Sequence, residues 1–172
     1  MLARMAARDI QTHLGHKPVR FEPDKVVTEG GEIPADLILF MPGLTGPAWL
    51  EDSGLPLSDG GFVAADETCR THGVDRVFVA GDVGSFPGPE WLAKQAHQAD
   101  LHAVTVAENI AAELRGAAAQ QGFKSELACI VDDLDSGMLV YRRGARIVVL
   151  PRLRLLHWAK RHFEQRYLQL LR

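Results

Sequence analysis

The sequence has few cysteines, no long apolar run and no residue spacing typical of a metal site. Its 172 residues contain two cysteines, too few for a disulfide framework, and neither lies in a CxxC or His-rich cluster. No stretch of 18 apolar residues occurs, so no segment is predicted to span a bilayer. Charged side chains interrupt residues 1–14, so no signal peptide is expected there, and the protein is expected to be cytoplasmic.

Acidic side chains are scarce in the last part of the chain. The net charge is −3, but nine of the 19 lysines and arginines lie in residues 142–172, where Glu164 is the single acidic residue. A basic tail on an acidic body favours an anionic partner surface, either a membrane or a nucleic acid. The 47% apolar and 24% charged content is that of a folded protein rather than a disordered one.

Apolar spacing predicts helices and short strands along the whole chain. Residues 1–14 have helical spacing, residues 29–32 form a predicted turn, and residues 36–41 are predicted to form a buried strand. Further strands are expected at 18–21, 25–28, 61–65, 127–131, 138–142 and 146–150. A long helix is predicted from about Glu90 to Arg115, and a basic amphipathic helix follows Pro151, which is expected to end the last strand. Residues 116–122 have the composition of a linker.

The run Val77-Phe78-Val79-Ala80-Gly81-Asp82 indicates a ligand site most strongly. Four consecutive apolar residues, two of them β-branched, predict a strand that is buried on both faces. Gly81 lets the backbone approach a ligand closely, because it has no Cβ. Asp82 then stands at the carboxyl end of the strand, where open α/β sheets place their ligands.

With its flanks, this run resembles the second flavin motif of the two-dinucleotide-binding-domain flavoproteins, the pyridine nucleotide-disulfide oxidoreductase superfamily. The flanks that carry the resemblance are Asp66-Glu67-Thr68-Cys69-Arg70-Thr71, Gly73-Val74-Asp75, Lys94 and Ala107-Glu108-Asn109-Ile110. The resemblance implies an α/β fold, FAD as cofactor, and a hydrogen bond from a ribityl hydroxyl to Asp82. It also implies that Lys94, on the first turn of the long helix, lies near the pyrimidine edge of the flavin, where Gln95 and Gln98 would add hydrogen bonds.

The Gly-rich turn GxGxxG, which holds the pyrophosphate in such folds, is missing from the sequence. On the resemblance, the chain is therefore the C-terminal part of a flavoprotein. Residues 1–35 would be a remnant of the second nucleotide-binding domain, 36–116 the C-terminal part of the FAD-binding domain, and 123–172 a small appendage of sheet and helix. The chain is not expected to hold FAD tightly by itself.

Cys129 lies on a predicted strand, where a free cysteine is typically a small buried residue. However, a strand cysteine followed by Ile130, an aspartate, Gly137 and a hydrophobic hairpin resembles sulfide:quinone oxidoreductases and flavocytochrome c sulfide dehydrogenases. That resemblance implies that Cys129 is catalytic, one of a redox pair whose second cysteine lies upstream, in an enzyme that oxidises sulfide and reduces quinone. Cys69 is expected to be structural.

Two other functions remain open from the sequence. One is a type II NADH:quinone oxidoreductase, which shares the flavin motif and in which Cys129 would be incidental. The other is a non-catalytic dimerisation fragment, and a homo-oligomer is left open in each case. His97 and His102 are five residues apart and do not share a helix face, so they are expected to be surface or packing residues and no metal is predicted.

The terminal helix combines arginines with an apolar stripe of Leu155, Trp158, Phe163, Tyr167 and Leu171. This pattern favours a helix that lies in the plane of a membrane surface. The alternative is a helix packed on its own domain or on a dimer partner; no nucleic-acid motif occurs, so nucleic acid is not expected. The resemblance likewise implies a peripheral membrane enzyme close to its quinone, which we expect on the inner face of the membrane.

Overall fold

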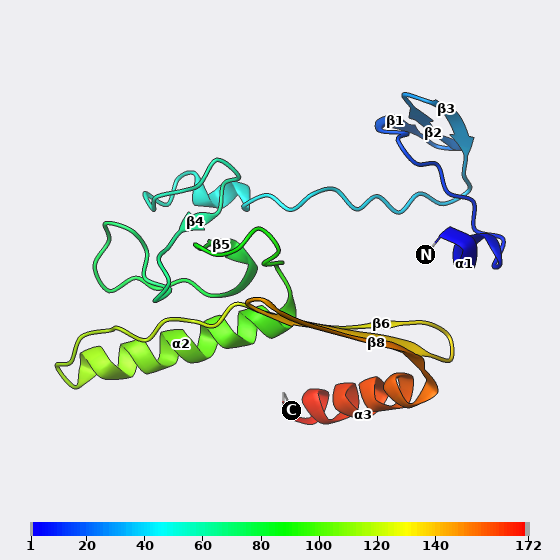
Figure 1. The fold of residues 1–172 in the computed structure, drawn as a ribbon. Helices are drawn as coiled ribbons and strands as arrows, with labels where there is room; N and C mark the ends of the chain where they lie inside the picture. Colours follow the sequence, from blue (N-terminus) through cyan, green and yellow to red (C-terminus); the bar gives the residue numbers. More distant parts are fainter. Residues whose placement is uncertain (1, 171–172) are drawn as a thin grey trace. The chain divides into compact units, whose positions relative to one another are not determined.

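The computed structural model describes residues 2–170 and divides into two compact units, Met1–Leu44 and Thr45–Arg172 (Figure 1). The first unit begins with the short helix α1, Leu2–Ala6. The predicted helix over 1–14 is therefore wrong in length. The amides of Asp9 and Ile10 donate to the carbonyls of Ala6 and Met5, and Asp9 has a left-handed φ of 60°. This is a Schellman cap, which ends the helix at Ala6, well before residue 14.

The rest of the first unit is a three-stranded antiparallel meander of β1 (Pro18–Glu22), β2 (Lys25–Thr28) and β3 (Gly31–Pro34). Thr28, the buried residue of β2, uses its hydroxyl to hold the β2–β3 turn: the oxygen donates to the Gly31 carbonyl and accepts from the Gly30 amide. The first two strands agree with the prediction. The third was missed because Gly-Glu-Ile-Pro resembles a turn more than a strand.

The predicted buried strand over residues 36–41 is wrong. The segment belongs to no strand, and its large side chains other than Ile38 are exposed, with Leu39 at 82% and Met41 at 92%. An apolar run is buried as a strand only when neighbouring strands pair with it and cover its faces. None of the described strands pairs with this segment.

The second unit opens with irregular chain around a small core. The 3-10 helix η1 spans Ala48–Leu50, and β4 (Val63–Ala64) pairs in parallel with β5 (Gly84–Ser85). The core of buried apolar side chains is Leu50, Val63, Ala65 and Val79, with Leu55, Leu57, Val83 and Phe86 packed against it.

The run Val77 to Ala80 does not form the strand that the sequence predicts. It makes a single bridge, from Phe78 to Arg70, and only Val79 is fully buried. The chain then turns into the 3-10 helix η2, Gly81–Val83. The prediction that the run is buried holds for Val79 alone, and a central strand also needs a hydrogen-bonding partner on each side. One bridge is all that the described residues provide.

Helix α2 spans Ala96–Leu114, six residues later at its start than predicted. Its buried residues are Gln98, His102, Thr105 and Asn109, which recur at helical spacing and so form one face. Its apolar Val104 and Leu114 are exposed. The helix therefore buries a polar face, the opposite of an ordinary amphipathic helix.

The C-terminal part is an antiparallel sheet in the order β6 (Glu126–Asp132), β7 (Gly137–Arg143), β8 (Arg146–Leu153), followed by α3 (Arg154–Leu170). All three strands were predicted. However, Pro151 does not end β8, because β8 is an edge strand and a proline there removes no obligatory hydrogen bond. The helix approaches the sheet closely at Gly137, where a Cβ would lie 3.2 Å from the His157 backbone nitrogen.

Candidate functional site

The loop at Gly81 and Asp82 borders a hollow of about 280 Å³ between the small core and the start of α2. Gly81 has a φ of +73°, a conformation that glycine adopts without strain. Asp82 follows in η2 with its side chain exposed. The predicted position of these two residues at the end of Val77–Ala80 is thus retained, although the run itself is not a full strand.

Lys94 closes one side of this hollow. Its ammonium donates to the carbonyls of Asp82, at 2.7 Å, and Gly84, at 2.5 Å, and it lies 4.0 Å from the centre of the Phe62 ring. Partial burial lowers the pKa of Lys94, while the nearby Asp82 carboxylate opposes that shift. The hollow therefore carries a fixed positive charge beside a backbone loop.

Lys94 does not lie on the first turn of the helix, as the sequence predicted. It precedes α2, whose N-cap is Gln95, and the Gln95 side chain makes no capping hydrogen bond. Both side chains nevertheless line the hollow with Gly81 and Asp82. The structure thus brings together the four predicted cofactor-binding residues, although two of them come from an extended segment instead of a helix.

Two further lining residues were not singled out as ligand-binding by sequence analysis. Phe62 gives the Lys94 ammonium an aromatic face, and His102 lines the hollow with only 4% of its surface exposed. His102 was expected to be a surface or packing residue, and it is a buried packing residue in contact with Phe86 and Phe123. A single histidine in a helical pattern gave no signal for this position.

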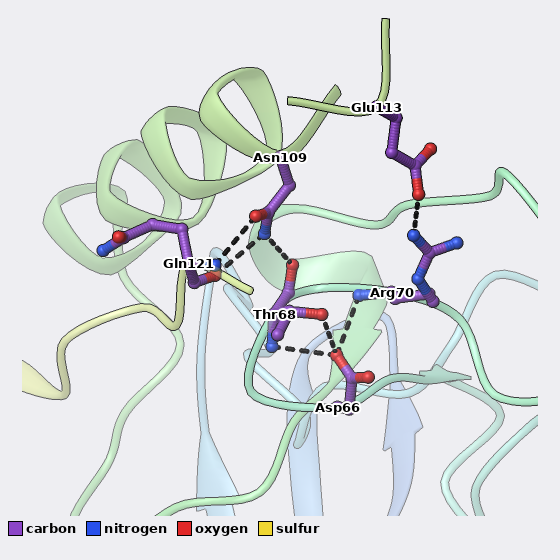
Figure 2. Close-up of polar contacts among 6 residues, drawn as sticks. All are labelled: Asp66, Thr68, Arg70, Asn109, Glu113 and Gln121. Carbon is purple, nitrogen blue, oxygen red and sulfur yellow. Dashed lines mark hydrogen bonds and ion pairs between the residues drawn. The ribbon is translucent and has the colours of Figure 1, made fainter. Parts of the chain in front are cut away.

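Asn109 holds the elements behind the site together (Figure 2). Its amide donates to the carbonyls of Thr68 and Gln121 at 2.9 and 2.8 Å, and its oxygen accepts from the Gln121 amide at 2.9 Å. Next to Thr68, one carboxylate oxygen of Asp66 accepts from the Thr68 amide and hydroxyl and from the Arg70 amide. These hydrogen bonds lower the pKa of Asp66 against the effect of burial.

The same loop is tied to α2 a second time. The Arg70 guanidinium pairs with Glu113 and lies 4.8 Å from the centre of the Phe78 ring. The motif residues that flank the Val77–Asp82 run therefore have a mainly structural role. They fix the loop and the helix that border the hollow.

Cys129 does not line the hollow. It lies on β6 with its side chain exposed, and the two-residue period of a strand puts it on the face opposite Ile130. Ile130 points towards Gly137, where α3 packs, so Cys129 lies on the sheet face away from α3. The thiol is therefore accessible to small molecules.

Cys69 is a poor partner for Cys129. Cys69 is fully buried, has a left-handed φ of 63°, and burial raises its pKa to about 12. A thiol with such a pKa is not a thiolate at neutral pH and does not exchange readily. Both cysteines are free, and Cys69 fills the small core as the sequence predicted.

Residues 2–170 contain no group of three histidine, cysteine, aspartate or glutamate side chains that could bind a metal ion. Nε2 of His97, on α2, lies 3.3 Å from a carboxylate oxygen of Glu126, at the start of β6. None of the helices described between Leu2 and Leu170 combines the length and the apolar character that crossing a membrane requires.

Comparison with known proteins identifies the family. The family model for pyridine nucleotide-disulphide oxidoreductases matches residues 1–111, which include the Gly81–Asp82 loop and most of α2. The fold is similar to the crystal structure of the sulfide:quinone oxidoreductase from the hyperthermophilic bacterium Aquifex aeolicus, with a TM-score of 0.78 and 21% identity. That match covers 97% of this chain and 43% of the Aquifex chain, so this chain spans less than half of that enzyme's length.

Among curated proteins, none matches the chain. The structural likeness and the family model together confirm the predicted fold class, a partial FAD/NAD(P)-binding fold of mixed α/β type. Because the family model covers well over half of the sequence, the chain belongs to the pyridine nucleotide-disulphide oxidoreductase family.

Proposed function

We propose that this chain is the C-terminal portion of an FAD-dependent enzyme that oxidises sulfide through a cysteine pair and passes the electrons to quinone. The observation that carries the proposal is the convergence of Gly81, Asp82, Lys94 and Gln95 on one hollow. Residues 1–35 and 36–116 would belong to the two nucleotide-binding domains, and 123–172 would form the appendage that carries Cys129.

The donor and acceptor groups around the hollow fit part of a flavin nucleotide. Asp82 offers an exposed carboxylate to a sugar-like hydroxyl, and the left-handed Gly81 keeps the backbone free of a Cβ. The side-chain amide of Gln95, at the start of α2, makes no capping hydrogen bond. The lack of GxGxxG agrees with a site that holds only part of the cofactor, because pockets bury most of a ligand that they bind tightly.

FAD, when bound, accepts two electrons from a donor and delivers them to an acceptor. The contribution of this chain would be electrostatic. Lys94 holds a positive charge at the hollow, and its two carbonyl acceptors and the Phe62 ring fix its position. Such preorganised charge stabilises negative charge that develops in a reaction, because no reorganisation is needed when it forms.

Cys129 would accept the sulfur atom of sulfide. Hydrosulfide attacks a disulfide between Cys129 and a second cysteine, one sulfur becomes a persulfide, and the other leaves as a thiolate. Cys69 is a poor candidate for the second cysteine, because it is fully buried and burial raises its pKa to about 12. The exposed position of Cys129 supports this role, because the reaction needs an accessible sulfur.

A type II NADH:quinone oxidoreductase is the second candidate. One observation favours it: Cys129 lies outside the hollow that the flavin-binding residues surround. The two candidates differ in the electron donor. In the FAD-loaded full-length enzyme, we expect sulfide to bleach the flavin absorbance and NADH to leave it unchanged. Rapid reduction by NADH alone would favour the second candidate.

Cys129→Ser tests the residue itself, because a hydroxyl cannot form a disulfide or a persulfide. We expect FAD to remain bound and sulfide-dependent reduction to disappear. Cys69→Ser is the matched control and should leave sulfide-dependent reduction intact wherever the protein still folds. Unchanged sulfide reduction in Cys129→Ser would return Cys129 to a structural role. Failure of the full-length enzyme to take up FAD would leave the dimerisation fragment as the remaining candidate.

Helix α3 would hold the enzyme on the inner face of the membrane, near its quinone. Its exposed apolar side chains are Leu155, Trp158, Phe163 and Leu168, and arginines stand among them. They do not form the single stripe that the sequence predicted. Tyr167 is partly buried and donates a hydrogen bond to Asp100, and Leu171 lies outside the described residues. Aromatic residues with arginines suit an interfacial helix better than a nucleic-acid groove.

A further inference from the structure

Arg142 stands on the same face of the C-terminal sheet as Cys129. Cys129 on β6 lies directly opposite Val140 on β7, and Arg142 follows Val140 by two residues. The alternation of side chains along a strand therefore puts all three on one face, the face away from α3. Diagonal neighbours on a sheet face are about 7–8 Å apart, so the cation is anchored close to the thiol.

The guanidinium of Arg142 is held by Trp91, which belongs to the segment before α2. Its central carbon lies 4.6 Å from the centre of the indole ring, and its Nε donates to the Gly144 carbonyl at 3.5 Å. Both side chains are half-buried. Neither an aromatic ring nor a carbonyl carries a negative charge, so these contacts fix the guanidinium without neutralising it.

The charge of Arg142 is not compensated by a carboxylate. Two neighbouring arginines of the sheet are paired, Arg143 with Glu126 at 3.5 Å and Arg152 with Asp133 at 2.8 Å. Within the described range 2–170, Arg142 forms no such ion pair. The strand residues that share its face are apolar apart from Cys129: Leu127, Val131, Met138, Val140, Ile147 and Val149.

A cation at this place changes which molecules reach Cys129. Residues 1–141 contain 21 acidic and 10 basic side chains, so the field over most of the chain disfavours anions. A charge in water acts over about 8–10 Å at 0.1–0.15 M salt, and Arg142 lies within that range of the thiol. Anions that approach the exposed thiol are therefore attracted locally, whereas neutral molecules of the same size are not.

We propose that Arg142 attracts anionic sulfur species to Cys129, and that Trp91 is the positioning residue that holds the guanidinium there. For the proposed function, the species captured would be hydrosulfide, the anion of sulfide, in preference to neutral hydrogen sulfide. That identity rests on the proposed sulfide oxidation. The attraction of anions to the thiol does not, because it depends on the sheet and on the segment before α2 alone.

The first test uses the 172-residue chain without cofactor and two disulfide reagents. Dithiobis(nitrobenzoate) carries a carboxylate on each half, and dithiodipyridine is neutral. In both reactions the Cys129 thiolate attacks the reagent, a mixed disulfide forms, and the other half leaves as a coloured product. Cys69 does not compete, because it is fully buried. The ratio of the two rates at one pH cancels the thiolate fraction and reports the effect of reagent charge.

We expect Arg142→Gln to lower the rate with the anionic reagent about 3-fold relative to the neutral one at low salt, and by almost nothing at about 1 M salt. Arg142→Lys should retain most of the preference, because it keeps the charge. Trp91→Phe should retain it as well, whereas Trp91→Leu should lose part of it, because no aromatic face remains to hold the guanidinium.

Arg143→Gln is the matched control. It removes the same charge from the opposite face of β7, where Glu126 already pairs with it, and should change the ratio of rates by less than about 1.5-fold. An unchanged ratio in Arg142→Gln, or an equal fall in Arg143→Gln, would overturn the proposal. Either result would leave the flavoprotein function standing.

The second test uses the FAD-loaded full-length enzyme. Arg142→Gln should raise the KM for sulfide about 3-fold and leave kcat unchanged, because the attraction acts on capture of the anion. A lowered kcat with an unchanged KM would overturn the capture of hydrosulfide by Arg142. Absence of sulfide-dependent reduction in the unaltered enzyme would overturn the proposed function, and the ratio of reagent rates would still decide whether Arg142 attracts anions to Cys129.

Discussion

Helices α2 and α3 are of similar length but are held to the protein in opposite ways. Helix α2 buries amides and an imidazole, and each of Gln98 and Asn109 makes three hydrogen bonds to loops or neighbouring side chains. Helix α3 leaves Trp158 and Phe163 about two-thirds exposed. Side-chain pairs such as His157 with Asp132 attach it to the sheet. Buried polar contacts demand one geometry, whereas exposed aromatic residues leave a surface available to a partner.

The comparison can be tested first at Asn109, where we expect the largest effect. Asn109→Leu removes three hydrogen bonds of a buried side chain to the backbone of the half-buried Thr68 and the exposed Gln121. Each hydrogen bond contributes about 0.5–1.5 kcal/mol, so we expect the free energy of unfolding to fall by about 2–4 kcal/mol in urea denaturation. Glu108→Gln, the exposed neighbour, should change it by less than about 0.5 kcal/mol.

The second prediction concerns the pH dependence that His102 gives to α2. Its pKa is about 4 in the folded protein against an ordinary 6.5, so the unfolded chain binds the proton more readily. Stability is then fully present above pH 6.5 and falls as the pH decreases towards 4. The loss is about 3 kcal/mol. His102→Asn should lack this part of the pH dependence, and an unchanged slope between pH 7 and 4 would contradict the prediction.

The third prediction tests the exposed surface of α3. Each aromatic side chain can bury about 150–250 Å² at about 25 cal/mol per Å², and each nearby cation adds about 1 kcal/mol with anionic lipid. We expect binding to anionic vesicles to weaken with salt but to survive it. Replacing both Trp158 and Phe163 by Ser should reduce binding at least about 100-fold in sedimentation. Replacing the exposed Gln165 and Gln169 by Ser is the control. Vesicle binding that persists in the first double variant would make α3 a packing or dimer helix.

An element of the fold could be predicted where the sequence pattern that determines it lies within the element itself. Strands β6 and β7 were predicted correctly because their apolar residues and the turn residues that flank them lie close together in the sequence. The segment 36–41 and the run 77–80 were assigned as strands from composition, but strand formation also depends on distant partners. The four residues around the hollow were found through the motif. His102 was not, because a buried polar helix face has the same pattern as a solvent-exposed one.

The smallest expected effect lies at the attachment of α3. His157 donates to Asp132 at 2.9 Å, and this hydrogen bond is the main cause of the lowered pKa of Asp132, whose ordinary value is 3.8. A carboxyl with a lowered pKa stabilises the fold above its ordinary pKa, and this contribution disappears as the pH falls through the folded value. Asp132→Asn should therefore lower the urea midpoint slightly at pH 7 and have no effect well below pH 3.8. Asp135→Asn, at an exposed turn position, should have no effect at either pH.

The stretch after α2 has a consequence for protein engineering. Residues 116–122 have the composition of a linker, yet Asn109 holds Gln121, the Glu67 carbonyl accepts from the Phe123 amide, and Gln98 holds Lys124. Protease cleavage between Gln121 and Lys124 should therefore require local opening of these hydrogen bonds. A tag or new chain termini placed between Gln121 and Lys124 should therefore lower the solubility of the protein. The exposed turn at Arg143 and Gly144 should tolerate such an insertion.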